Sequence, residues 1–201
     1  MTPTLLDANY LWVDSRPRAL VQDLLEARTL CQLAGRPVTG RAMEIGCGRR
    51  GTGSRLAIAR FDVAHVDAID LHPGSVHACR AALSDLDDRV SVDVGDARSL
   101  TAPDSTYDAV FSYHLLHHTP DWRRAVAEAA RVLRPGGLLL SVEMTARLID
   151  NPLLRLVSRH PDDDDRPTAD TLAAAFTASG LRLKGRRGLV GCWSAAVTER
   201  T

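Results

Sequence analysis

The hydrophobic positions of this chain follow a helical period in some segments and an alternating period in others. Apolar side chains recur at helical spacing over residues 20–33, which predicts a helix that ends at Gly35 and Pro37. Its apolar face consists of Leu20, Leu24, Ala27 and Cys31. Residues 41–46 (RAMEIG) then predict a short strand, and residues 54–60 a helix.

The same alternation of strand and helix continues to residue 144. Strands are expected at residues 65–70, 89–96, 107–113 and 137–144, and helices at residues 73–83 and 121–133. Asp121 is placed to cap the second of these helices, and RPGG at residues 134–137 predicts the turn into the last strand. This order predicts parallel strands joined by right-handed crossovers, with ligands bound where the strands end.

The tail predicts one more helix and two more strands. The helix covers residues 168–179, and the strands cover residues 180–187 and 189–200, with Gly188 as a tight reversal between them. Such a reversal would end the sheet in an antiparallel pair. The expected fold is therefore α/β, a Rossmann-like doubly wound sheet that is mostly parallel and has a C-terminal antiparallel strand pair.

Composition narrows the classes of partner. Lys and Arg total 25, as do Asp and Glu, so a net positive field that would gather nucleic acid is not expected. No apolar run approaches the roughly 20 residues of a membrane helix, and the first residues lack the pattern of a secretion signal, so we expect a cytoplasmic protein. The four cysteines are scattered, which favours reduced thiols over disulfides or a zinc site: Cys31, Cys47, Cys79 and Cys192.

The loop after the first predicted strand has two interpretations. Gly46, Gly48 and Gly51 match G-x-G-x-x-G, and Asp70 follows at the spacing of a dinucleotide fingerprint, which indicates an NAD-linked oxidoreductase. Glu44, two residues before the first glycine, opposes that interpretation. A carboxylate there would repel a pyrophosphate but would accept hydrogen bonds from a ligand that carries an ammonium group.

Four motifs in order favour the second interpretation. The chain resembles the class I S-adenosylmethionine-dependent methyltransferases, a group that includes the quinone-biosynthesis methyltransferases, in four motifs. These are EIGCG, Asp70, VGDARSL (residues 94–100), and YDAVFSYHLLHH with RVLRPGGLLL (within residues 107–140). The resemblance covers residues 41–144. It implies that the glycines pass close to the methionine part of S-adenosylmethionine, and that Asp70 holds the ribose hydroxyls. It also implies that Asp96 meets the adenine amino group and that Ala97 packs on the ring. The cofactor-binding residues it implies are Glu44, Gly46, Cys47, Gly48, Asp70, Leu71, Asp96, Ala97, Ser112 and Tyr113. One departure is the loop glycine, which stands at Gly51 where the family often has it at the position of Arg50.

Histidines follow the fourth predicted strand, beside the place where the methyl group should emerge. Methyl transfer to a hydroxyl requires that the acceptor lose a proton, and a histidine suits that role, whereas a carboxylate acceptor needs no base. His114 and His118 are the candidate bases, ranked equally, and the alternative is that the histidines only hold the loop. H-x-x-H-H with Glu143 would be a weak metal site, and we predict no metal.

The acceptor should be bound by segments outside the shared motifs. We expect an N-terminal helical segment at residues 1–40, a methyltransferase domain at residues 41–201, and a short insertion on the substrate side at residues 146–167. Tyr10, Leu11 and Trp12 form an apolar lid or pack on the sheet, and Asp162–Asp165 is a solvated loop.

The short insertion fits a small acceptor, or a homodimer in which a second subunit closes the site. The predicted function is O-methylation of a small molecule; the alternatives are an oxidoreductase and a non-catalytic binding protein.

Overall fold

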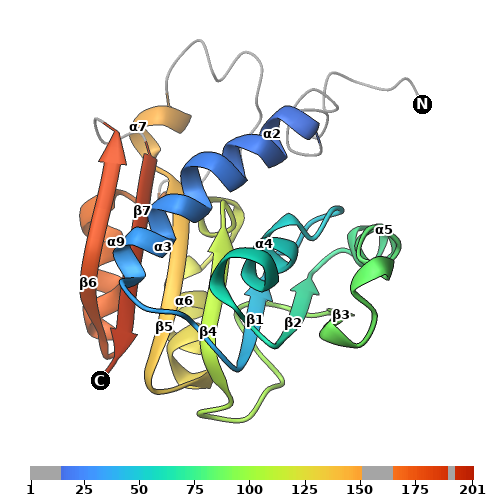
Figure 1. Cartoon of the computed structure of the whole chain (residues 1–201). Helices are drawn as coiled ribbons and strands as arrows, with labels where there is room; N and C mark the ends of the chain where they lie inside the picture. Colours follow the sequence, from blue (N-terminus) through green and yellow to red (C-terminus); the bar gives the residue numbers. More distant parts are fainter. Residues whose placement is uncertain (1–14, 151–164, 190–192) are drawn as a thin grey trace.

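A seven-stranded sheet forms the centre of the protein (Figure 1). The computed structural model describes residues 15–150, 165–189 and 193–201. The strand order is β3-β2-β1-β4-β5-β7-β6; the first five strands are parallel, and β7 runs antiparallel to both of its neighbours. This confirms the predicted doubly wound fold with its antiparallel C-terminal pair. The strands are β1 (Arg41–Ile45), β2 (His65–Asp70), β3 (Val90–Val94), β4 (Tyr107–Tyr113), β5 (Leu133–Met144), β6 (Leu181–Leu189) and β7 (Trp193–Arg200).

Helices cover both faces of the sheet. A continuous N-terminal helix and α4 lie over the face that Figure 1 presents, here called the front, and α6 and α9 lie behind. The N-terminal helix has three parts, of which the middle one, η1, is π-helical. The helices are α2 (Arg16–Val21), η1 (Gln22–Ala27), α3 (Arg28–Ala34), α4 (Thr52–Phe61), α5 (Pro73–Ala82), α6 (Trp122–Val132), α7 (Ala146–Ile149) and α9 (Ala169–Ala178), with 3₁₀ turns η2 (Ser84–Arg89) and η3 (Leu116–His118).

The two faces of the sheet bury separate apolar cores because side chains alternate along each strand. On the front, Leu30 of α3 and Phe61 of α4 pack with Phe111 of β4, and all three are at most 3% exposed. On the back, Trp122 of α6 packs with Leu139 of β5. β4 and the second half of β5 are nearly continuous buried runs, as expected for central strands covered on both sides.

The N-terminal helix also reaches the last two strands. α3 packs against β6 and β7. Arg187 of β6 donates a hydrogen bond of 2.6 Å from Nη1 to Oε1 of Gln32. Gly185 lies so close to this helix that a Cβ atom there would come within 2.9 Å of the Leu33 side chain. The N-terminal helix and the last two strands of the sheet are therefore packed against each other.

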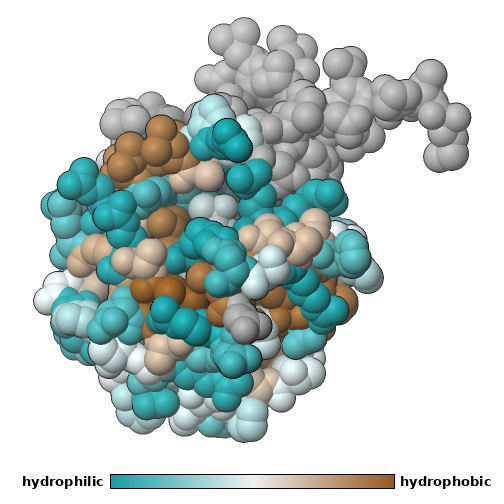
Figure 2. Space-filling model, turned by 45° about the vertical axis from the view of Figure 1, so that its right-hand side comes forward, coloured by the Kyte–Doolittle hydropathy of each residue, from teal (hydrophilic) through white to brown (hydrophobic). Residues whose placement is uncertain are grey.

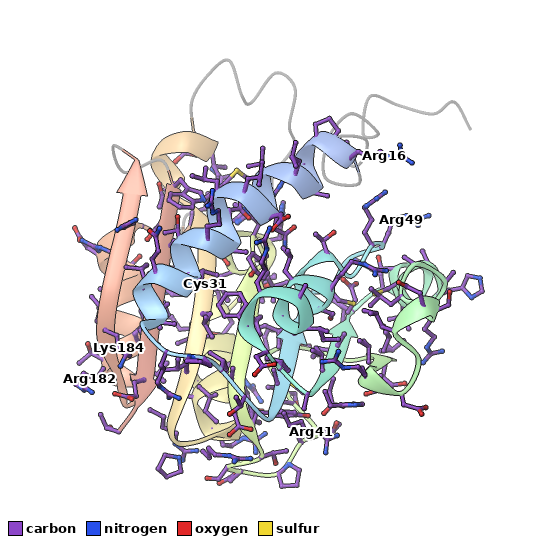
Figure 3. The ribbon with its side chains drawn as sticks, in the orientation of Figure 1. Arg16, Cys31, Arg41, Arg49, Arg182 and Lys184 are labelled. Carbon is purple, nitrogen blue, oxygen red and sulfur yellow. The ribbon has the colours of Figure 1, made fainter. Side chains whose placement is uncertain are left out.

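The parallel strands all end at the upper edge of the sheet in Figure 1, and the strand order reverses there between β1 and β4. Figure 3 labels Arg41 at the lower edge, where β1 begins, and Arg49 at the upper edge, in the loop that follows β1. In doubly wound sheets this upper edge is the place of ligand binding. The N-terminal helix crosses the front of the sheet close to it.

The helix predicted at residues 20–33 is present. The second half of its predicted apolar face is confirmed, since Ala27 is buried and Cys31 packs against the front core, but the first half was wrong. Leu20 and Leu24 are 56% and 50% exposed, whereas Gln22 and Glu26 are buried. Apolar side chains, several of them on this helix, therefore interrupt the hydrophilic surface (Figure 2). The reason is that this half of the helix lies over the polar ends of the strands, and its π-helical turn changes which side chains face inward.

Three local predictions were also wrong. Gly188 is not the reversal, because it pairs with Ser194 inside the β6–β7 ladder. Asp121 stands at the N-cap of α6 with a left-handed φ of 54°, and within the described part of the chain its side chain makes no capping hydrogen bond. The RPGG segment belongs to β5, where the pairing with β4 shifts register.

Some predictions fall outside the described residues. They concern Tyr10, Leu11, Trp12, Cys192 and most of the 146–167 insertion. Of the cysteines that the structure describes, Cys31, Cys47 and Cys79 are free thiols. None of the described helices is long and apolar enough to cross a membrane.

Candidate functional site

The glycine loop after β1 is fastened to the end of β2 through its backbone. The amides of Gly46 and Cys47 donate to the carbonyl oxygen of Ile69 at 2.8 and 3.0 Å, and the Gly48 amide donates to Oδ2 of Asp70 at 3.0 Å. Gly46 has a φ of 74°, and a Cβ atom there would lie 2.7 Å from the Leu115 side chain, so glycine is required. Three successive amides are thus already bonded within the protein.

Glu44 stabilises the start of α4. Its carboxylate is 2% exposed; Oε2 accepts hydrogen bonds from the backbone nitrogen of Ser54, at 2.7 Å, and from the Ser54 hydroxyl. The Gly53 amide also bonds to this carboxylate, and a Cβ atom on Gly53 would lie 2.0 Å from Oε1. Burial raises the pKa of Glu44 to about 7, against the lowering effect of the Ser54 hydrogen bonds. Glu44 therefore fills the helix N-terminus, which in dinucleotide-binding proteins holds the pyrophosphate.

Asp70 and its neighbours suit a nucleoside. Besides the Gly48 amide, the Asp70 carboxylate accepts the His72 amide at 2.9 Å, and each of its oxygens keeps a lone pair for a ribose hydroxyl. Leu71 follows Asp70, and Val94 pairs with Asp70 in the β2–β3 register; both apolar side chains are 55% exposed. A carboxylate between exposed apolar side chains fits a ribose joined to a flat, apolar base.

Asp96 and Ala97 follow β3 at the same edge. The Asp96 carboxylate accepts hydrogen bonds from the backbone nitrogen and the guanidinium of Arg98, which lower its pKa. Its side chain is 31% exposed, so part of the carboxylate is still open to a ligand. Ala97 is buried and packs in the back core. The structure thus brings Gly48, Asp70 and Asp96 to one edge, as the sequence predicted.

Other predicted cofactor residues point away from that edge. The Cys47 thiol is buried against Cys79, and this contact and its burial raise its pKa. Ser112 lies on the back face, with its hydroxyl 3.4 Å from Oε1 of Glu143. Tyr113 lies on the front face, where its ring approaches Gly53 and Glu44. Because side chains alternate along a strand, Ser112 and Tyr113 serve opposite faces.

The three histidines have different surroundings. His114 has a left-handed φ of 55°, and its Nε2 lies 3.0 Å from Oε1 of Glu26 in η1. His117 is buried, with Nδ1 2.9 Å from Oε2 of Glu143. His118, one of the two candidate bases, is exposed and its ring packs against His117 at 4.2 Å between centroids. Of the two candidates, His114 is held by the Glu26 carboxylate beneath the N-terminal helix.

Glu143 organises the loop after β4. Its Oε1 accepts the backbone amides of Leu115 and Leu116 at 3.2 and 3.1 Å, and its Oε2 contacts His117. The carboxylate is fully buried, and burial raises its pKa to about 7. The sequence suggested this residue only as a metal ligand, whereas the structure gives it the role of a hydrogen-bond acceptor that fixes η3.

Glu26 is the residue of the site that the sequence analysis missed. It lies 88 positions before His114 and on a helix whose leucines suggested a different buried face. The available signal was an acidic residue, Glu26, four positions after Gln22 and next to Ala27, a spacing that puts polar side chains on one helix face.

The comparisons with known proteins agree with this geometry. A sequence profile described as a methyltransferase domain matches residues 43–141. The chain is 42% identical over 101 residues to the 27-O-demethylrifamycin SV methyltransferase of Amycolatopsis mediterranei, which covers 49% of this chain and 36% of that protein. The chain belongs to the class I methyltransferases. S-adenosylmethionine is the methyl donor of this family.

Two further relatives extend the comparison for this methyltransferase. The fatty-acid O-methyltransferase of Mycolicibacterium smegmatis is 34% identical over 133 residues, which cover 59% of this chain and 46% of that protein. The chain thus spans less than half the length of these two curated relatives. A SAM-dependent methyltransferase from Aquifex aeolicus shares the fold with a TM-score of 0.71 at 14% identity, and the match covers 100% of both chains.

Proposed function

We propose that this protein transfers the methyl group of S-adenosylmethionine to an oxygen atom of a small-molecule acceptor. The observation that carries the proposal is the position of Glu44. Its carboxylate bonds to the first amides of α4, and the glycine-loop amides are bonded to β2, so neither is available to a pyrophosphate. A cofactor without phosphates suits this edge, and a dinucleotide does not.

The residues present fit that cofactor in separate parts. Asp70 would hold the ribose hydroxyls, Leu71 and Ala97 would contact the adenine, and Asp96 would accept from its amino group. The backbone at Gly46 and Gly48 would approach the methionine part, because a Cβ atom at Gly48 would meet nothing within 4 Å. The bound cofactor supplies a methyl group on a positively charged sulfur, and the protein aligns the acceptor and excludes water.

Two observations support oxygen as the atom that accepts the methyl group. The printed names of two relatives state O-methylation, namely the fatty-acid O-methyltransferase above and a chloroplastic tocopherol O-methyltransferase of rice. His114 lies directly after β4 and is held by Glu26, which gives the site a base for a hydroxyl acceptor. The acceptor would bind beside this histidine, where β4 ends, and we assign its selection to the short insertion at residues 146–167 and the closure of the site to a lid or to a second copy of the chain.

Calorimetry with S-adenosylhomocysteine and with NAD tests the class. We expect micromolar or tighter binding of the first compound and no measurable binding of the second. Tight NAD binding without a response to the sulfur compound would establish the oxidoreductase interpretation instead. Incubation with methyl-labelled S-adenosylmethionine and a panel of phenols, alcohols and carboxylic acids then tests transfer. A protein that binds the cofactor and labels none of these acceptors would not be an O-methyltransferase of small molecules.

A further inference from the structure

A buried polar cluster joins the N-terminal helix to the end of β4. Oε1 of Glu26 lies 3.0 Å from Nε2 of His114, and Oε2 accepts a hydrogen bond of 3.1 Å from Nη2 of Arg18. The side chains of Arg18, Glu26 and His114 are 12%, 4% and 17% exposed. Both oxygens of one carboxylate are therefore committed, and the carboxylate is fixed on two sides.

The ionisation of Glu26 determines which nitrogen of His114 carries a proton. Burial raises the pKa of Glu26, but the hydrogen bond and charge of His114, together with Arg18, outweigh this and lower it below the ordinary value. An ionised carboxylate only accepts hydrogen bonds, so Nε2 of His114 must be the donor. In the neutral ring the lone pair then resides on Nδ1.

Nδ1 of His114 is buried and, among the residues that the structure describes, has no hydrogen-bond partner. The same holds for the hydroxyl of Tyr113 and for Nη1 of Arg18. Buried polar atoms are normally satisfied, so three such atoms around one carboxylate indicate a position that a ligand or water fills. Of the three, only Nδ1 of the neutral histidine is an acceptor and never a donor.

The backbone at both ends of the pair supports a functional role. His114 adopts a left-handed φ of 55°, which is uncommon for a residue other than glycine. Glu26 lies in a π-helical turn, a feature found often at functional sites. Strain and an irregular helical turn thus meet at the same hydrogen bond, at the edge of the sheet where the methyl acceptor would bind.

We propose that Glu26 is a positioning residue for His114 in methyl transfer to a hydroxyl acceptor, and that it keeps the proton on Nε2 so that Nδ1 faces the acceptor. The acceptor O–H bond breaks and its proton moves to Nδ1, while the acceptor oxygen forms a bond to the methyl carbon. The carbon–sulfur bond breaks, and its electron pair stays on sulfur. The Glu26 carboxylate stabilises the resulting imidazolium until the proton passes to solvent. This inference rests on the proposed function.

Glu26→Gln provides a sharp test because Arg18 is always a donor. The single amide oxygen of the glutamine would face Arg18, so its NH₂ group would face Nε2 of His114. Nε2 would then have to accept, and the proton would move to Nδ1. The matched control is Asp23→Asn, because Asp23 lies in the same π-helical turn but bonds Arg60.

The tautomer is measured by long-range ¹H–¹⁵N correlation on the full chain with labelled histidine and S-adenosylhomocysteine bound. The His114 signals are identified by their loss in His114→Asn. We expect the Nε2–H form in the wild type and in Asp23→Asn, and the Nδ1–H form in Glu26→Gln. An Nδ1–H form in the wild type, or an Nε2–H form retained in Glu26→Gln, would overturn the assignment. The wild-type measurement does not need Glu26→Gln, so it decides even if that variant does not fold.

Kinetics with a hydroxyl acceptor from the labelling panel give a second readout. Glu26→Gln should lower kcat by about 100-fold and leave KM for S-adenosylmethionine within about twofold, since proton transfer contributes to the transition state alone. An unchanged kcat would refute the positioning role. Failure of S-adenosylhomocysteine to bind the wild-type protein would instead refute the proposed function, so the two failures are distinguishable.

Discussion

The buried carboxylate of Glu44 should make the stability of this protein depend on pH. Its pKa stands at about 7 in the folded protein, against 4.5 for the ordinary carboxyl group, because burial disfavours the charged form. The folded state therefore binds a proton that the unfolded state releases. The stabilisation is complete below pH 4.5 and is lost as the pH rises through 7. The difference corresponds to about 3 kcal/mol in the free energy of unfolding.

Replacing Glu44 by glutamine removes this titration. Glutamine keeps one oxygen for the Ser54 amide and has nearly the volume of glutamate, so Glu44→Gln should fold. The free energy of unfolding is measured in urea at pH 5, 6, 7 and 8. Between pH 5 and pH 8 it should fall by about 2.5 kcal/mol more in the wild type than in the variant. Glu199→Gln is the control, since Glu199 bonds Arg182 at the surface, and it should keep the wild-type slope. Equal slopes in Glu44→Gln and the wild type would refute the reasoning.

Three further predictions concern the cofactor edge and its support. Asp70→Ala should weaken S-adenosylhomocysteine binding by about 1–3 kcal/mol in calorimetry, because charge-assisted hydrogen bonds are lost. The control Asp93→Asn, at the end of β3, should leave binding unchanged. An unchanged dissociation constant in Asp70→Ala would contradict the ribose assignment. Gly53→Ala should lower the free energy of unfolding by about 2 kcal/mol or more, because its Cβ atom would meet Glu44, while Gly74→Ala, with open space around it, should raise it by about 0.5–1 kcal/mol. Glu143→Leu should lower the free energy of unfolding in urea by about 3 kcal/mol or more, because the Leu115 and Leu116 amides and the His117 ring lose their acceptor. A smaller loss would show that the loop rearranges.

Much of the fold could be predicted because periodicity reports burial. Strands such as β1 and β4 are short runs of mainly apolar residues, and the helices that connect strands show a helical period. The predicted order of the elements and the predicted directions of the strands were therefore confirmed. The first half of the predicted apolar face of the N-terminal helix was wrong for a physical reason. Leu20 and Leu24 are more hydrophobic than Glu26, and hydrophobicity alone would bury them. The edge of the sheet that this helix covers is polar, however, so the Glu26 carboxylate is buried there and the leucines are exposed.

The site could be predicted where it depends on local motifs and not where it depends on distant pairs. Asp70 and Asp96 follow their strands directly, so the topology alone brings them to one edge. The partner of His114 comes from a helix near the N-terminus, and that of His117 from the next strand. A single sequence does not show which residues pair across such distances, because any acidic residue in the chain could have been the hydrogen-bond partner of either histidine.

The packing of α3 on β6 and β7 links the first described helix to the last strands of the chain. During synthesis on a ribosome the helix emerges first, yet the surface that holds it is completed only when β7 has been released. Native packing of α3 therefore depends on contacts between segments far apart in the sequence, which form late in folding. A nascent chain that stops short of β7 would lack part of the surface on which α3 packs.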